Sequence, residues 1–206
     1  MSISEKLITI AENEQRVYEK GKQDEYDVFW DSYQVNGTRT GYNGAFGNER
    51  WTDTIFKPKY DFLGVKNAMQ MFSYAQITKI QKTVEIIGSA QYLFSSSFIN
   101  TISLLRVTEN VNVSTWFSGC KYLITVNWDG VIGSNLDMSA CVNLSKASIL
   151  STFSCLSSTA SGMTLTLSKT AVNNAFETSS GTADGSTSEE WLNLVATKPN
   201  WTISLS

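Results

Sequence analysis

The sequence predicts an α/β fold, a right-handed β-α solenoid with a repeat of about 22 residues, preceded by an N-terminal helical segment. A Phe-Ser pair begins at Phe72, Phe94 and Phe117, so that the pairs are 22 and 23 positions apart. A short apolar run follows each pair, whereas the start of the chain carries a helical pattern. Repeats of roughly 20–29 residues are typical of leucine-rich solenoids, whose units stack because none can bury its apolar face alone.

The composition excludes several classes of function. The chain has 206 residues, of which 17% are charged, and a formal net charge of −3, so it lacks the basic stripe of a nucleic-acid-binding protein. No run of about eighteen apolar residues predicts a membrane span. The opening "MSISEKLITIAENEQ" has no cationic stretch followed by an apolar run. We therefore expect no signal peptide, and a protein that stays in a cytoplasm or is assembled there into a larger body.

The residue types available argue against an enzyme. Histidine is absent, which removes the commonest general base and the commonest metal ligand. The three cysteines have no CxxC spacing and predict neither a disulfide framework nor a zinc site. We therefore expect no catalytic residue, no cofactor and no metal. A carboxylate pair can hydrolyse glycosides without histidine, and Asp53 and Asp61 leave that alternative as a distant third hypothesis.

The segment 1–36 is expected to be helical and to oligomerise or anchor the protein. Its apolar residues follow the four-then-three spacing of a coiled-coil seam, interrupted at Glu14. The seam residues are Ile3, Leu7, Ile10 and Val17. A lone helix of this length is marginal in water, so it needs a partner, either the protein's own solenoid or other copies. Isoleucine on the seam favours more than two strands, and our hypothesis is a homotrimer.

The segment 37–66 is expected to be an aromatic, turn-rich connector that caps the solenoid. Gly41, Gly44 and Gly47 stand at regular spacing, but no Lys-Ser/Thr follows them. We interpret this stretch as turns and not as a phosphate-binding loop. Pro58 excludes a helix in "WTDTIFKPKYDF", which we expect to pack over the first repeat.

The segment 67–206 is expected to hold the repeats and a C-terminal cap. Each repeat is predicted to form a capped helical turn that ends at Phe-Ser, followed by a short strand. The predicted strands are 77–80, 99–102 and 123–128, and Met138-Ser139 continues the Phe-Ser series. The phenylalanines are expected to stack in an interior column, with small buried thiols beside it. The residues predicted to form the repeat core are Phe72, Phe94, Phe117, Ile80, Ile102, Cys120, Leu123, Cys141 and Leu144.

The end of the chain predicts a strand–helix–strand cap over the exposed edge. "SKASILSTFSC" and "SKTAVNNAF" are predicted to be helical, and "MTLTLS" alternates as a strand should. Thr187 and Glu190 have capping-box spacing before "WLNLVAT", and "WTISL" is predicted to be the last strand. The oxygen side chains from Asp184 to Glu190 superficially resemble a calcium loop, but the glycine is misplaced, so we interpret them as a solvated linker and a helix cap.

Several of these motifs carry a resemblance to known proteins. "MFSYAQITKI", "LFSSSFINTI" and "WFSGCKYLITV" resemble the divergent leucine-rich repeats of the BspA-like group, in which Phe-x-Gly-Cys precedes an apolar strand. Only the unit from Phe117 to Cys120 keeps that phrase in full. The head "SEKLITIAENEQRVYEKGKQDEYDVFWDSYQVNGTRTGYNGAFGNERWTDTIFKPKYDF" resembles the start of proteins encoded in phages and prophages of Gram-positive gut bacteria. The tail "LSKASIL…LTLSKTAVNNAFETSSGTADGSTSEEWLNLVATKPNWTISL" resembles their ends, and together the resemblances cover nearly the whole chain.

The resemblance implies a virion-associated structural or attachment protein and carries over no catalytic residue. Its expected location is the virion, at the tail, baseplate or fibre, and its expected partners are other virion proteins or a ligand on the host surface. Phage fibres and spikes are commonly trimeric, which agrees with the hypothesis of a homotrimer. The alternative is a cell-associated recognition or adhesion module of the BspA kind. The absence of a signal peptide favours the phage protein.

Overall fold

The computed structural model describes residues 41–47, 51–53, 56, 58, 60–177 and 185–206. Within these ranges the chain is an α/β protein with two parallel sheets, one of four strands and one of three. The segment 1–36, and with it the predicted seam, lies outside the described residues. The seam residues concerned are Ile3, Leu7, Ile10 and Val17.

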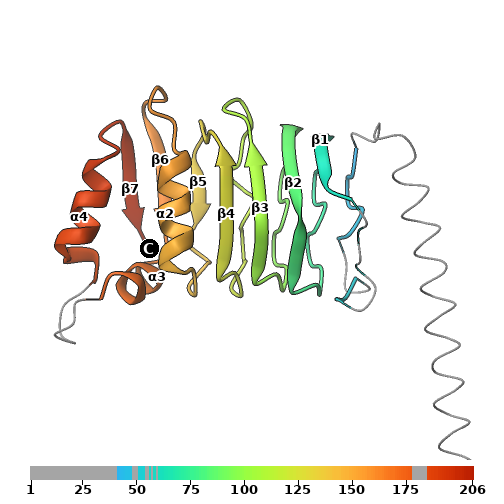
Figure 1. Ribbon diagram of the computed structural model, residues 1–206, viewed down its shortest axis with the longest axis horizontal. Helices are drawn as coiled ribbons and strands as arrows, with labels where there is room; N and C mark the ends of the chain where they lie inside the picture. The colour runs from blue at the N-terminus through green and yellow to red at the C-terminus, as the bar shows by residue number, and fades with distance from the viewer. Residues whose placement is uncertain (1–40, 48–50, 54–55, 57, 59, 178–184) are drawn as a thin grey trace, which may run out of the picture.

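The first sheet is built from strands that follow one another in the sequence (Figure 1). These strands are β1 (Phe62–Asn67), β2 (Lys79–Ser89), β3 (Thr101–Val107) and β4 (Thr125–Gly130). Their order in the sheet is β1-β2-β3-β4, and all neighbours are parallel. Ile80 pairs with Ile102, and Ile102 pairs with Val126, so one row of buried β-branched side chains crosses three strands.

The predicted strand positions are wrong at their starts. Strands β2, β3 and β4 each begin two residues after the predicted 77, 99 and 123, and all three run further than predicted. Ile77 and Ile99 are buried, but they lie in the bends before the strands. The N–H groups of Asn100 and Thr101 both donate to the carbonyl of Thr78, which joins the segment before β3 to the segment before β2. An apolar residue therefore marks the core here and not the strand start.

The predicted helical turns before each strand are not helices in the structure, which has short turns in their place, closed by bonds such as that from the N–H of Ala75 to the carbonyl of Phe72 (3.2 Å). The N–H of Phe72 donates to the carbonyl of Leu93 (2.9 Å), and that of Phe94 to Trp116 (3.0 Å), instead of bonding four residues back. The chain then takes a left-handed conformation at Tyr74 (φ 59°), which a continuing right-handed helix does not allow. These bonds join each turn to the next one along the chain.

The rings of the Phe-Ser pairs lie in one column inside the molecule. Phe72, Phe94 and Phe117 are buried, and consecutive ring centroids are 5.5 Å apart with nearly parallel planes. Phe46, which the sequence analysis assigned to a turn-rich connector, adds a fourth ring 5.3 Å from Phe72. The connector is thus partly interior, because its backbone bonds to the next turn at Phe46 and Met71 (2.8 Å).

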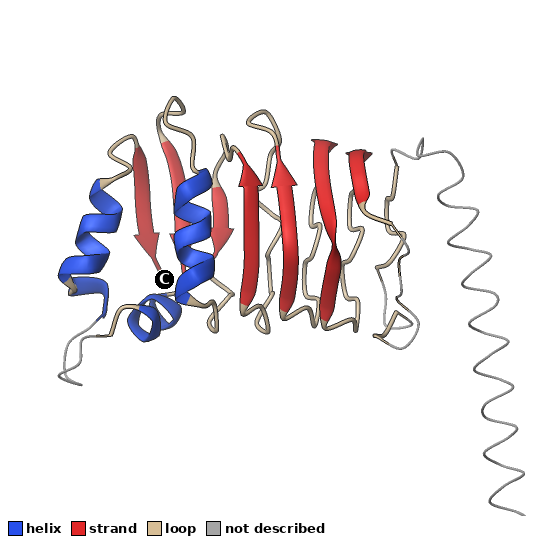
Figure 2. Ribbon diagram, in the orientation of Figure 1, coloured by secondary structure: helices blue, strands red, loops and turns tan. Residues whose placement is uncertain are grey.

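The second sheet and the helices occupy the C-terminal part (Figure 2). The sheet has the parallel order β5 (Leu136–Met138), β6 (Met163–Leu167) and β7 (Trp201–Leu205). The helices are α2 (Lys146–Cys155), α3 (Lys169–Ala175) and α4 (Glu189–Ala196), with a short 3-10 helix η1 (Gly185–Thr187) before α4. Met138, predicted to continue the Phe-Ser turns, instead ends strand β5 and is fully buried.

Helix α2 takes the place beside β4 that a fifth strand would occupy. The hydroxyl oxygens of Ser148 and Ser151 accept the N–H groups of Val126 (2.9 Å) and Trp128 (2.8 Å), so the edge of the first sheet is satisfied by side chains. This is how the protein closes the edge of β4. The N-cap of α4 is Ser188, which accepts from the N–H of Trp191, and not the predicted Thr187.

Candidate binding surfaces

The predicted repeat-core residues form the interior and offer no contact to a ligand. None of them is more than 3% exposed. They are Phe72, Phe94, Phe117, Ile80, Ile102, Cys120, Leu123, Cys141 and Leu144. Their contribution is to hold consecutive turns in place, and any binding function must come from residues on the outside.

The buried cysteines belong to this interior and not to a reactive site. Burial raises the pKa of Cys120 to about 12, and the Cys120 thiol donates to the carbonyl of Phe94 (3.0 Å). Burial also raises the pKa of Cys141 well above its ordinary value. Because the thiolate is the nucleophile, both side chains are inert thiols near neutral pH.

Exposed aromatic side chains gather where the chain leads into the strands of the first sheet. We call this surface the aromatic edge, and its residues are Tyr74, Phe98, Tyr122 and Ile124, each at least 45% exposed. The segments lie at the lower ends of β2, β3 and β4 in Figure 1. The rings of Phe98 and Tyr122 stack with centroids 4.9 Å apart and an interplanar angle of 12°.

Backbone bonds fix the aromatic edge. The N–H of Phe98 donates to the carbonyl of Ala75 (2.9 Å), and the N–H of Ile124 to Asn100 (2.9 Å). The side chain of Asn143 donates to the carbonyl of Lys121 (3.0 Å), next to the ring of Tyr122 in the chain. The stacked pair is therefore presented on a rigid backbone, and such rings bury large apolar area at little entropic cost when a partner binds.

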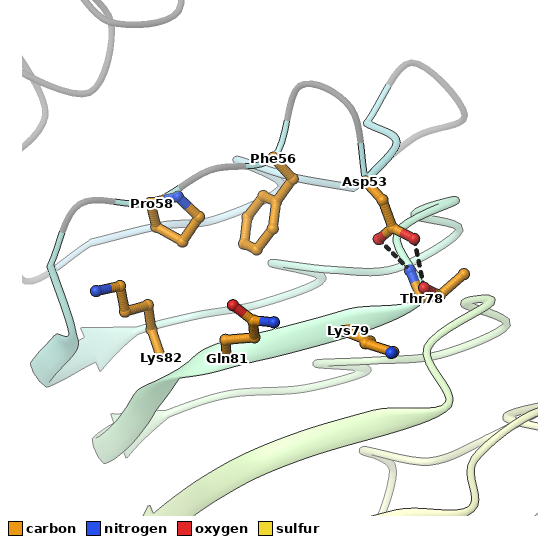
Figure 3. Close-up of a pocket in the computed structure, with 7 residues that line it drawn as sticks. All are labelled: Asp53, Phe56, Pro58, Thr78, Lys79, Gln81 and Lys82. Carbon is orange, nitrogen blue, oxygen red and sulfur yellow. Dashed lines mark hydrogen bonds between the residues drawn. The ribbon is translucent and has the colours of Figure 1, made fainter.

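A recess lies between the connector and strand β2 (Figure 3). It encloses about 590 Å³. Its lining residues are Asp53, Phe56, Pro58, Thr78, Lys79, Gln81 and Lys82. The carboxylate of Asp53 accepts the N–H of Thr78 (2.7 Å) and also its hydroxyl, so Asp53 closes the start of β2. The recess brings one satisfied carboxylate together with exposed lysine and glutamine side chains.

The two carboxylates of the glycoside-hydrolysis alternative have structural partners. Asp53 accepts from Thr78, and Asp61 accepts the N–H of Thr83 (2.8 Å). Each carboxylate thus holds a different part of β2 to the preceding segment. Nothing in this arrangement favours hydrolysis.

A second recess, of about 450 Å³, lies beyond the ends of β3 and β4. Its one carboxylate, Glu109, accepts hydrogen bonds from the hydroxyls of Ser157 and Thr159, which lower its pKa. The ammonium group of Lys198 donates to the carbonyl of Leu156 (2.8 Å). These bonds tie the turn after α2 to its neighbours, so the charged groups here serve the fold.

A row of charges crosses the outer face of the first sheet. Arg106 lies between Glu85 (3.4 Å) and Asp129 (2.7 Å), which are its register partners on β2 and β4. Asp129 raises the pKa of Arg106, and Arg106 lowers that of Asp129. Exposed pairs of this kind contribute little stability, roughly 0–1 kcal/mol, and their main effect is to favour this register.

Sequence reasoning missed the aromatic edge, although the residues carried a signal. Phe98 and Tyr122 each follow a Phe-Ser pair by four or five positions, and each stands directly before the apolar residue that precedes a strand. That constant position in consecutive repeats indicates side chains that lie next to each other. The period was used for the interior residues only.

The described part of the chain has no group of three histidine, cysteine, aspartate or glutamate side chains that could hold a metal ion. None of its helices is long and apolar enough to cross a membrane. No protein-family model, curated protein or solved structure matches the chain.

Proposed function

We propose that the protein is a non-enzymatic structural protein of a bacteriophage particle, associated with its tail, baseplate or fibre. It presents a rigid surface for attachment to the host or for assembly with other virion proteins. The observation that carries the proposal is the stacked, exposed pair Phe98 and Tyr122, held on an interior of stacked rings. Exposed aromatic side chains on a rigid support are typical of binding surfaces.

The proposal includes a right-handed solenoid of divergent leucine-rich repeats. Two rows of backbone contacts support it. Strands that neighbour each other in the first sheet also neighbour each other in the sequence. The turns between them bond in the same succession, with Phe72 bonded to Leu93 and Phe94 to Trp116. A chain that coils turn upon turn produces both rows, since every repeat then contacts only its neighbours.

Assembly is proposed to occur through the segment 1–36. In this proposal three copies of the chain associate through the coiled-coil seam of this segment. The particle is assembled in the cytoplasm of the bacterial host. The aromatic edge then stays available for a ligand on the host surface or for another virion protein. Neither nucleic acid nor a membrane span has a part in this function.

A BspA-like recognition or adhesion module is the alternative. The same aromatic edge favours it as much as the phage protein, since either function needs an exposed binding surface. Mass spectrometry of particles purified after prophage induction separates the two. The phage protein is found in the particles with their capsid and tail proteins, whereas the adhesin is found on the cell surface.

Binding to host cells tests the role of the aromatic edge. We expect Phe98→Ala with Tyr122→Ala to weaken binding of the full chain to cells of the host by about tenfold or more, because a central aromatic anchor is lost. The matched control is Tyr92→Ala, which removes an aromatic side chain that is 43% exposed and lies outside the aromatic edge. Equal binding by the double variant and the control contradicts the proposal.

A further inference from the structure

Strand β7 ends the second sheet with one unpaired edge (Figure 2). The N–H of Ser206 donates to the carbonyl of Leu167 (3.1 Å), so the even-numbered residues of this segment face β6, because alternate residues of a parallel strand bond to the same side. The N–H and C=O groups of Ile203 and Leu205 therefore point to the open edge. The described part of the chain offers them no partner there.

The chain leaves this edge without the usual protection. The sequence of β7, "WTISL", has no charged residue and no proline. The edge of β4, in contrast, is covered by Ser148 and Ser151 of helix α2. Helix α4 is drawn beyond β7 in Figure 2 and the ring of its Trp191 lies 5.7 Å from that of Phe153 on α2, but within the described residues it gives no hydrogen bond to β7.

Two rows of apolar side chains cross the second sheet and stop at β7. The rows are Leu136, Leu165 and Ile203, and Met138, Leu167 and Leu205. The members on β5 and β6 are at most 1% exposed, whereas Ile203 and Leu205 are only partly buried. Each row therefore ends at β7 without a neighbouring side chain on the next strand. A strand added there must place apolar side chains on the inner face of the sheet.

We propose that a second copy of this chain completes the sheet, with its β7 antiparallel to the first and a two-fold axis at Ile203. In this register Ile203 faces the Ile203 of the second copy, and Trp201 faces Leu205. Thr202 then meets Ser204 on the outer face, so no like charges oppose each other.

The strand is complementary to itself in this one register. In this register all five residues of β7 are paired. The N–H and C=O groups that point to the open edge of one copy meet those of the other, and both apolar rows continue into the second copy. This self-complementarity is the reason to choose a second copy over an unrelated strand. The interface goes beyond the proposed function and uses none of the residues of the segment 1–36.

Cysteine cross-linking of the full chain tests the register. Directly opposed residues that exchange both backbone bonds have Cα atoms about 5.5 Å apart, within the range of a disulfide. We expect Ile203→Cys to form a covalent dimer under mild oxidation, since the native cysteines Cys120, Cys141 and Cys155 are buried. The matched control Thr202→Cys faces Ser204 of the second copy and is expected to stay reduced. Absence of the dimer, or equal cross-linking of both variants, overturns the proposal.

Sedimentation velocity tests the association itself. We expect Ile203→Lys to lower the mass of the assembly and to weaken association by at least about tenfold, because two ammonium groups then meet at the axis. Thr202→Lys adds the same charge to the same strand and is expected to leave the mass unchanged. Circular dichroism verifies that both variants are folded. If the wild-type assembly has the same mass as that of folded Ile203→Lys, the proposal is overturned. It is also overturned if Thr202→Lys lowers the mass of the assembly as much as Ile203→Lys does.

Discussion

Phe94 lies between two other phenylalanine rings, with centroids 5.5 Å away at Phe72 on one side and at Phe117 on the other. The planes are inclined by 12° and 22°, so the rings meet face to face. Phe46 continues the column beyond Phe72. A ring in this position gains dispersion contacts from both neighbouring turns, and each turn is thereby coupled to the next.

Phe94→Ala is expected to lower the free energy of unfolding by about 3–5 kcal/mol, because it leaves a cavity between two rings that cannot both move in. Chemical denaturation of the full chain measures the change. The control is Phe98→Ala, which removes a ring that is 45% exposed and is expected to cost no more than about 1.5 kcal/mol. A change within about 0.5 kcal/mol for Phe94→Ala would show that this ring contributes nothing to the interior.

Regular spacing was enough to predict which rings lie inside, but only where the spacing was kept. Phe72, Phe94 and Phe117 are 22 and 23 positions apart, whereas Phe46 precedes Phe72 by 26. The glycines around Phe46 indicated turns and hid the fact that a turn can also supply a core residue. The exposed pair Phe98 and Tyr122 shares a constant position before the apolar residue that precedes each strand, but burial does not mark it, because both side chains are exposed.

At the scale of elements, the turns before the strands differ most from the expectation. A capping-type residue before an apolar turn predicts a helix only if the N–H groups bond back along the chain. Here alternate N–H groups bond to the following turn, as that of Phe72 does to Leu93, and such non-local partners leave no local trace in the sequence. Gly119 takes the left-handed conformation at φ 72°, and a Cβ there would lie 2.8 Å from the hydroxyl of Ser96.

Helix α2 shows how a helix can end a parallel sheet. Ser148 supplies a hydroxyl oxygen to the buried N–H of Val126 on β4 (2.9 Å). We expect Ser148→Ala to cost about 1–3 kcal/mol in the free energy of unfolding, because that N–H then loses its partner. Thermal or chemical denaturation measures the loss.

Ser154 provides the control on the same helix. Its exposed hydroxyl donates to the carbonyl of Ser151 (2.7 Å) and satisfies no strand. Ser154→Ala is expected to change stability by no more than about 0.5 kcal/mol. Equal effects of the two substitutions would mean that the hydroxyl of Ser148 does not serve as the cover of the sheet edge.

At the scale of the whole molecule, the period predicted units that stack in the order of the sequence, but not the division of their strands into two sheets. The segment "MTLTLS" was predicted to be a strand from its alternation and "WTISL" was predicted to be the last strand, and they form β6 and β7. Strand β5, which pairs with β6, was missed, because its three residues, Leu136–Met138, are too few to show alternation. Which strands pair depends on contacts far apart in the sequence, and a single sequence carries no direct signal of these.

The proposed solenoid requires consecutive units to stack in two rows. One row is formed by the strands of the first sheet, and the other by the turns between them. In the strand row, Thr101 and Thr125 are register partners on β3 and β4. In the turn row, Met69 and Gln91 hold equivalent places. The N–H of Ala68, just before Met69, donates to the carbonyl of Ser89, and the N–H of Gln70, just after it, donates to the carbonyl of Gln91. A solenoid requires both rows at once, whereas a flat sheet with mobile connections requires the first only.

Disulfide formation in double-cysteine variants of the full chain measures this most directly. We predict that Thr101→Cys with Thr125→Cys, and separately Met69→Cys with Gln91→Cys, oxidise to internal disulfides, because neighbouring strands lie about 4.8 Å apart. The control, Thr101→Cys with Asn127→Cys, is two residues out of register and should remain reduced. Bridges in both rows with a reduced control are the result that stacked turns require. A bridge in the strand row alone, or equal oxidation of the control, would contradict the account.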